Sequence, residues 1–174
     1  FTVNTCHATS AWFGYEAGIE KISDALADPG VLAKVRAVLV ETASLIVDKH
    51  GVPAETQAAY VEKILKRFAN PALPDTTLRV GRAPLRKLSR NDRFISPAAQ
   101  LAERGMSRDA LLEAIGAGLR FDTQDDPEAV ELQSLLATAT AAEVVDTVTG
   151  LAGDHPLYAD VLAVVEARQA GRTR

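Results

Sequence analysis

The segment VLAKVRAVLVETASLIVDK, residues 31–49, has the clearest helical periodicity in the chain. Its apolar residues recur at intervals of three and four, which is the spacing of one face of an α-helix. Asp28 and Pro29 precede the segment and Gly51 follows it, as is typical of the start and the stop of a helix. The face that we expect to be buried comprises Val31, Leu32, Val35, Val38, Leu39, Thr42, Leu45 and Ile46.

The next helix is expected over residues 53–68, and the short HGVP link between the two segments predicts an antiparallel pair. The inward side chains of this second helix are predicted to be Ala58, Val61, Ile64, Leu65 and Phe68.

The rest of the chain also has helical patterns. Residues 1–4 suggest a short extended piece, but no other segment alternates convincingly as a strand would. We expect Asn4 or Thr5 to cap the first helix and Ser96 to cap a later one. The small apolar residues 114–118 predict a central, closely packed helix. The fold class is therefore predicted to be all-α, with one domain over residues 1–174 and further helices over residues 5–18, 23–27, 96–104, 107–121, 127–138, 141–149 and 156–169.

The composition indicates a globular protein and argues against several functions. The 174 residues have a net charge of −4, and the few aromatic residues are not interleaved with the cations, which disfavours nucleic-acid binding. No apolar run is long enough to span a bilayer. Cys6 is the one cysteine, so no internal disulfide is possible and a reducing, cytoplasmic location is expected. The acids at residues 125–128 are interpreted as the start of a helix, not as a metal site.

A basic stretch follows the second long helix: RFANPALPDTTLRVGRAPLRKLSRNDRFI, residues 67–95. From Arg79 to Arg93 it contains six basic residues and one acidic residue, Asp92. Its three prolines prevent one continuous amphipathic helix. Positive charge concentrated on an interrupted segment of an acidic chain favours an anion-binding site, and an arginine-rich surface turn is the alternative.

Two pieces of this sequence resemble a known family. NTCHA, residues 4–8, is similar to the N-x-x-H motif of the polyol-specific long-chain dehydrogenases. The basic stretch looks like the signature of their mannitol-1-phosphate 5-dehydrogenase branch. The likeness continues through EKILKRFANP and LRFDTQDDPEAVEL, so it covers most of the chain. One departure is Cys6, where this branch is expected to have glycine.

The resemblance implies an N-terminal Rossmann-type NAD domain followed by a helical C-terminal substrate domain. Such enzymes interconvert mannitol 1-phosphate and fructose 6-phosphate with NAD(H). Their general acid/base is a lysine five residues before the motif asparagine, which is a position upstream of Phe1. We therefore expect this chain to be a fragment that lacks both the NAD domain and that lysine, and to be inactive alone.

The resemblance also assigns roles to residues at the front of the chain. Asn4 would orient the reacting oxygen, and His7 would hold a substrate hydroxyl or the surroundings of the lysine. Hydride transfer needs a base for the hydroxyl proton and donors aimed at the developing negative charge, and asparagine and histidine supply such donors. The alternative for His7 is a partly buried histidine with a structural role.

Arg79, Arg82 and Lys87 keep the spacing of the family residues that contact the polyol. An arginine in the middle position suits a phosphorylated substrate, because guanidinium presents a fork of donors that matches phosphate oxygens. The other cations of the basic stretch would pair with acids such as Asp75 or Asp92, or face the missing domain; they are Arg86, Arg90 and Arg93.

A different class of function is also compatible with the sequence. A non-catalytic helical module could use the basic stretch to bind an anion or the acidic surface of a partner. A nucleotide-binding domain encoded upstream of Phe1 would distinguish the enzyme from such a module.

Overall fold

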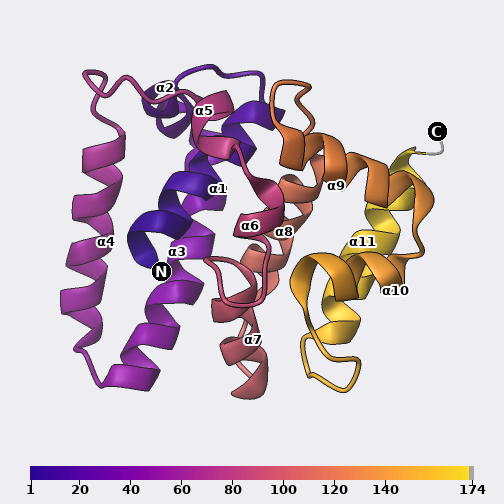
Figure 1. Cartoon of the computed structure of the whole chain (residues 1–174). Helices are drawn as coiled ribbons and strands as arrows, with labels where there is room; N and C mark the ends of the chain where they lie inside the picture. The colour runs from indigo at the N-terminus through magenta and orange to yellow at the C-terminus, as the bar shows by residue number, and fades with distance from the viewer. Residues whose placement is uncertain (173–174) are drawn as a thin grey trace. The chain divides into compact units, whose positions relative to one another are not determined.

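A computed structural model describes residues 1–172, and these residues contain helices but no β-strand; an isolated bridge joins Lys21 and Thr76. The predicted all-α class is confirmed (Figure 1). The chain divides into two compact units, Phe1–Gly81 and Arg82–Arg174. The first unit contains α1 (Thr2–Glu16), α2 (Ile22–Ala27), α3 (Pro29–His50), α4 (Ala54–Phe68) and α5 (Thr77–Gly81). The second contains α6 (Pro84–Lys87), α7 (Ile95–Glu103), α8 (Asp109–Arg120), α9 (Pro127–Thr138), α10 (Ala141–Val144), the π-helix η1 (Val145–Thr149) and α11 (Tyr158–Arg172).

Helix α3 follows the predicted pattern at both ends. The Asp28 side chain accepts a hydrogen bond of 2.9 Å from the backbone N–H of Val31, so it satisfies a donor that the first turn leaves open. Gly51 ends the helix with φ of 64°, a conformation that favours glycine. Most of the predicted face is buried, with Leu32 and Ile46 half-buried.

Helices α3 and α4 lie side by side and are joined by a short link, which confirms the predicted pair (Figure 1). Arg36 on α3 and Glu62 on α4 form an ion pair between them, with 3.1 Å from Nη2 to Oε2. The predicted inward face of α4 is correct except at Ala58, which is exposed. Gln57 is buried instead, because its amide donates to the Thr2 hydroxyl at 3.3 Å.

The expected extended start of the chain is wrong. Helix α1 begins at Thr2, because the carbonyl of Phe1 accepts a hydrogen bond of 2.8 Å from the N–H of Thr5. Asn4 and Thr5 therefore lie inside the first turn, and neither side chain caps it.

Helix α1 is the centre of the first unit and packs against α2, α3, α4 and α5. Trp12 is fully buried, and its indole N–H donates to the carbonyl of Gly81 at 3.0 Å. Gly14 allows the closest approach: a Cβ there would lie 2.8 Å from both the Ala25 Cβ and the Thr77 Cγ2. This glycine is needed for space, not for an unusual φ.

The second unit has helices close to the predicted ranges, but their starts differ. The N-cap of α7 is Phe94 and not Ser96, and α8 begins at Asp109. Residues 114–118 are buried as predicted, and α8 packs against α11 and α7.

The segment predicted as one helix over 141–149 consists of α10 and η1. Thr140 and Glu143 form a capping box at its start, and Gly150 ends it with φ of 61°. The expectation that the tail at 171–174 frays concerns residues of which 173 and 174 lie outside the described part, whereas α11 continues through Arg172.

Replacing Gly14 with valine should destabilise the first unit by about 2 kcal/mol, because two tightly packed neighbours would have to move. Chemical denaturation followed by circular dichroism measures this loss. Gly153→Val is the matched control, since no atom lies within 4 Å of a Cβ built there. Equal midpoints for the two variants would contradict the close approach at Gly14.

Candidate functional site

His7 lies on α1 and is held from two sides. Its Nε2 is 2.9 Å from the Asp75 Oδ2, and its ring stacks on Phe68 with centroids 4.4 Å apart and an angle of 9° between the planes. Phe68 comes from the last turn of α4. The imidazole therefore has a fixed plane and a fixed charged partner, and its side chain is still 27% exposed.

Asp75 also binds Arg79 on its other carboxylate oxygen, across one turn of chain. Burial opposes the charged form of this carboxylate, but the hydrogen bond from Arg79 and the neighbouring His7 outweigh that effect and lower the pKa of Asp75. The acid is thus ionised near neutral pH. Asp75 was one of two acids expected to pair with Arg86, Arg90 or Arg93, and its partners are His7 and Arg79 instead.

Asn4 is exposed on the first turn of α1, three residues before His7. Residues three apart share a helix face, so the two side chains of the N-x-x-H motif leave α1 in a similar direction. Their catalytic roles stay a prediction.

Arg79 has a side chain that is 66% exposed, and only one of its terminal nitrogens is used by Asp75. Its backbone N–H donates to the Thr76 hydroxyl at 3.2 Å. The guanidinium of Arg79 is therefore anchored at one edge and keeps further donors for a ligand.

Arg82 and Lys87 belong to the second unit. The guanidinium of Arg82 is exposed and donates to the carbonyl of Asp125 at 3.0 Å. Lys87 is 5% exposed, and its ammonium donates to the carbonyl of Arg82. Arg82 thus presents its charge to solvent, whereas Lys87 supports the backbone from which Arg82 extends.

The pKa of Lys87 is lowered to about 8, first by burial and then by the positive charges of Arg93 and Arg86. Asp126 and Glu128 act in the opposite direction without cancelling the effect. Lys87 is therefore a cation that can lose its charge in the mildly alkaline range.

The acids at the start of α9 have a role that the sequence did not predict. The helix starts at Pro127 as expected, but no acidic side chain caps it. Instead, Asp126 Oδ2 accepts from the N–H of Ala83 at 2.7 Å, and Glu128 Oε2 accepts from the N–H of Arg86 at 2.9 Å. Ala83 has φ of 59°, an unusual value for a residue with a side chain, so this bond holds a strained turn at the start of α6.

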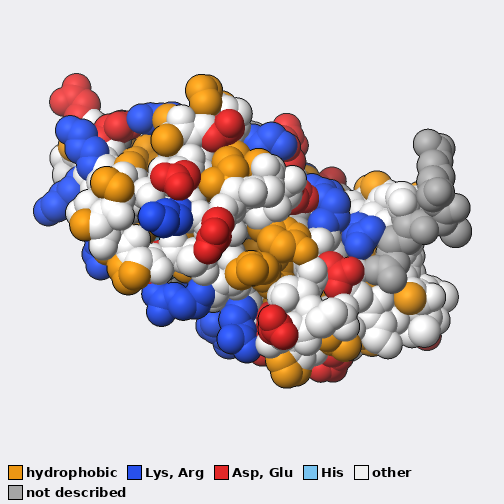
Figure 2. Space-filling view, turned by 90° about the horizontal axis from the view of Figure 1, so that it is seen from above, with side chains coloured by type: hydrophobic (Ala, Val, Ile, Leu, Met, Phe, Trp, Pro, Cys, Tyr) orange, Lys and Arg blue, Asp and Glu red, His pale blue; other side chains and the backbone are white. Residues whose placement is uncertain are grey.

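The other three arginines between Arg79 and Arg93 form ion pairs within the chain. Arg93 lies 2.7 Å from Asp92, and Arg86 lies 3.8 Å from the same carboxylate, as one of the sequence interpretations proposed. Arg90 instead lies 3.9 Å from Glu103. On the face shown in Figure 2, positive and negative side chains are interspersed.

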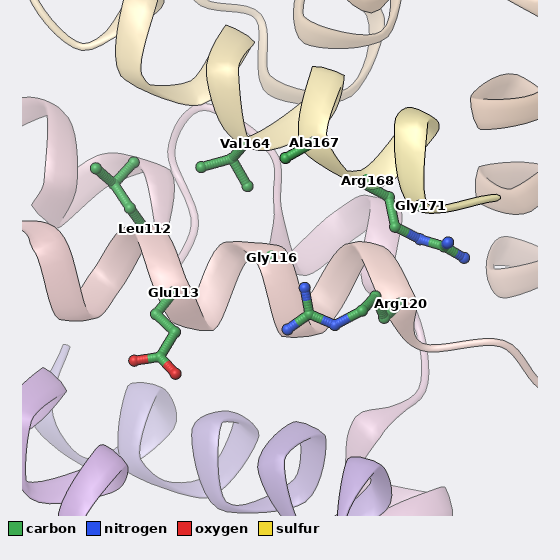
Figure 3. Close-up of a pocket in the computed structure, with 8 residues that line it drawn as sticks. All are labelled: Leu112, Glu113, Gly116, Arg120, Val164, Ala167, Arg168 and Gly171. Atoms are coloured by element: carbon green, nitrogen blue, oxygen red, sulfur yellow. The ribbon is translucent and has the colours of Figure 1, made fainter. Parts of the chain in front are cut away.

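A pocket of about 360 Å³ lies between α8 and α11 and contains none of the predicted site residues (Figure 3). Leu112, Val164 and Ala167 form its apolar side. The Arg120 side chain lies over Gly116, so that a Cβ added to this glycine would be 3.2 Å from Arg120 Nη1. Arg168 is bound to the carbonyl of Leu119 and the side-chain oxygen of Gln133. Arg168 is thus engaged by the chain and is not available as it stands for a ligand in this pocket.

Three other features bear on function. Cys6 is fully buried in regular helix, and burial raises the pKa of its thiol to about 12, although Ser10 acts in the opposite direction. Within residues 1–172, no group of three or more histidine, cysteine or acidic side chains is arranged to hold a metal ion. None of the described helices is both long enough and apolar enough to cross a membrane.

The family model described as the mannitol dehydrogenase C-terminal domain matches residues 1–164. The chain belongs to this family. The mannitol dehydrogenase match extends over most of both compact units, and the single domain over residues 1–174 stays a prediction.

Several curated relatives share more than half of their aligned residues with this chain. The chain is 62% identical to the mannitol-1-phosphate 5-dehydrogenase of Paenarthrobacter aurescens, over 98% of this chain and 44% of that protein. It is 53% identical to the enzyme of the same name from Talaromyces marneffei, again over 98% of the chain and 44% of the relative. The chain therefore spans less than half the length of these mannitol dehydrogenase relatives.

A solved structure has the same fold. Pseudomonas fluorescens mannitol 2-dehydrogenase, in a ternary complex with NAD and D-mannitol, superposes with a TM-score of 0.68 over 98% of this chain and 36% of that one. At 19% identity, the likeness concerns the fold of the mannitol dehydrogenase C-terminal domain alone.

Lys87 should make stability depend on pH. The folded chain loses the Lys87 proton near pH 8, whereas the ordinary lysine pKa of 10.5 applies to the unfolded chain. Between these values the unfolded chain binds more protons, so the free energy of unfolding should rise with pH, by up to about 3 kcal/mol. Denaturant midpoints between pH 7 and pH 10 measure this rise.

Lys87→Met should remove that rise, and Lys63→Met, which changes an exposed lysine on α4, should leave it intact. A rise that persists in Lys87→Met would assign the pH dependence to another group.

Proposed function

We propose that this chain is the substrate domain of an NAD-dependent mannitol-1-phosphate 5-dehydrogenase, which interconverts mannitol 1-phosphate and fructose 6-phosphate. The observation that carries the proposal is the 62% identity with a protein of that name over nearly the whole chain. NAD binds the N-terminal part of the full-length enzyme, which is the family's nucleotide domain. We place the protein in the cytoplasm, and we expect this chain alone to be inactive and not to bind NAD.

In this proposal the chain orients the reacting alcohol. On oxidation, a hydride leaves the carbon for the nicotinamide and the hydroxyl proton leaves for a base, which the family resemblance places upstream of Phe1. The Asn4 amide donates to the oxygen that becomes the carbonyl of fructose 6-phosphate, and His7 contacts a substrate hydroxyl. In reduction, the same amide stabilises the negative charge that develops on the carbonyl oxygen.

Arg79, Arg82 and Lys87 bind the polyol phosphate. The exposure of the Arg82 guanidinium and its single backbone contact support Arg82 as the phosphate ligand. Arg79 keeps donors beyond the one that Asp75 uses, which supports contact with polyol hydroxyls. Lys87 is buried and bound to the Arg82 carbonyl, so its part is to fix Arg82 as well as to contribute charge.

The alternative is a non-catalytic helical module that binds an anion or an acidic partner. The pairing of most cations in the basic stretch with acids of the same chain weakens it, because little uncompensated charge is left for a broad acidic surface. The identity with dehydrogenases favours the enzyme further.

Arg82→Ala in the full-length enzyme should raise KM for mannitol 1-phosphate by about 10- to 100-fold, because a charged hydrogen bond to phosphate contributes roughly 1.5–3 kcal/mol. Steady-state kinetics against mannitol 1-phosphate measures this change. Arg104→Ala, at the end of α7, is the matched control and should leave KM as it is. An unchanged KM in Arg82→Ala would exclude a phosphate role for this residue.

Asn4→Ala should instead lower kcat, by about 10²- to 10³-fold, because it removes a donor to the developing oxyanion. Single-turnover measurement of NADH formation separates this loss from substrate binding. Full turnover with a raised KM would show that Asn4 binds the substrate without stabilising the transition state.

A further inference from the structure

The peptide group that joins Arg82 to Ala83 is held at both of its polar ends. Its carbonyl, which belongs to Arg82, accepts a hydrogen bond from the ammonium of Lys87. Its N–H, which belongs to Ala83, donates to Asp126 Oδ2 at 2.7 Å. Lys87 is 5% exposed and Asp126 is 4% exposed, so both side chains reach this peptide group from inside the second unit. A buried ammonium and a buried carboxylate thus fix the plane of one peptide group.

Ala83 has a backbone conformation that the local sequence disfavours. Its φ of 59° and ψ of 56° lie in the left-handed region, which is unfavourable for a residue with a Cβ. Pro84 follows it, and a residue before proline is restricted to extended conformations. The conformation therefore depends on partners outside the turn, and Asp126 is one of them.

The residues around the start of α9 make further contacts with the same turn. Glu128 Oε2 accepts from the N–H of Arg86 at 2.9 Å. The guanidinium of Arg82 donates to the carbonyl of Asp125 at 3.0 Å, and the Arg82 side chain is still exposed. The backbone from which Arg82 extends is therefore fixed against α9, while its charged end faces solvent.

We propose that Asp126 is a positioning residue for recognition of the substrate phosphate: by accepting from the N–H of Ala83, it holds the left-handed turn from which the Arg82 guanidinium extends to the phosphate. The proposal rests on the proposed dehydrogenase function and on Arg82 as the phosphate ligand. Asp126 does not contact the substrate and acts through Arg82. A ligand-binding side chain on a fixed backbone loses less conformational freedom on binding than one on a mobile turn.

Asp126→Ala in the full-length enzyme should raise KM for mannitol 1-phosphate by about 10-fold, because Arg82 is no longer held in its binding position. KM for NAD should stay within about two-fold, because the proposal places NAD on the N-terminal part of the enzyme. Asp125→Ala is the matched control: it removes the neighbouring exposed acid but keeps the carbonyl that Arg82 uses. An unchanged KM in Asp126→Ala, or an equal rise in Asp125→Ala, would overturn the proposal.

A double variant tests whether Asp126 acts through Arg82. In the Arg82→Ala background, Asp126→Ala should change KM for mannitol 1-phosphate by less than about two-fold, because the residue that it positions is gone. A general loss of folding would raise KM in both backgrounds. A further rise of about 10-fold in the double variant would therefore contradict the positioning role.

Asp126→Asn provides a second test that does not remove the buried side chain. The asparagine keeps an acceptor oxygen of similar reach, but a neutral acceptor binds the N–H of Ala83 more weakly, so KM should rise by only about 3-fold. Adding Ala83→Gly should reverse this rise, because glycine adopts a positive φ without help from a partner. A KM that Ala83→Gly does not lower would refute the link between the bond and the turn.

The failure of the underlying function has a different signature. A full-length protein that does not oxidise mannitol 1-phosphate would refute the proposed dehydrogenase, and an unchanged KM in Arg82→Ala would refute Arg82 as the phosphate ligand. Either result would also remove the basis for the role of Asp126. A raised KM in Arg82→Ala with an unaffected Asp126→Ala variant would refute the role of Asp126 alone.

Discussion

The carboxylate of Asp75 is the interaction on which the first unit's candidate site depends. Its two oxygens lie against the His7 imidazole and the Arg79 guanidinium, and the loop between α1 and α2 holds its backbone. A buried acid without partners would be costly, so each contact makes the others necessary. The histidine of the N-x-x-H motif has a carboxylate beside it because a residue 68 positions from His7 folds back against it.

In the second unit, acidic side chains hold the backbone in place by accepting hydrogen bonds from its N–H groups. Asp126 and Glu128 accept from the N–H groups of Ala83 and Arg86, and this stabilises a strained turn that no side chain of α6 itself caps. The cations of the basic stretch are therefore not all equally available to bind an anion. Acids and carbonyls of the chain engage most of its cations, and the guanidinium groups of Arg79, Arg82 and Arg86 remain exposed.

Patterns local in sequence predicted the fold well. The periodicity of residues 31–49, with Asp28 and Gly51 at its ends, defined α3, because a helix start and stop depend on nearby residues. The start of the chain was not predicted from its local sequence. The carbonyl of Phe1 accepts the first hydrogen bond of α1, although the residues there suggested an extended piece. The relation of Asp75 to Arg79 could have been found from their four-residue spacing, but its relation to His7 depends on tertiary packing and leaves no trace in spacing.

A crystal structure of the full-length protein with NAD and mannitol 1-phosphate is the most direct test of the proposed substrate site. The expected result is a substrate whose reacting oxygen accepts a hydrogen bond from the Asn4 amide and whose neighbouring hydroxyl contacts His7. A substrate bound away from Asn4 and His7 would contradict the proposed role of the N-x-x-H motif.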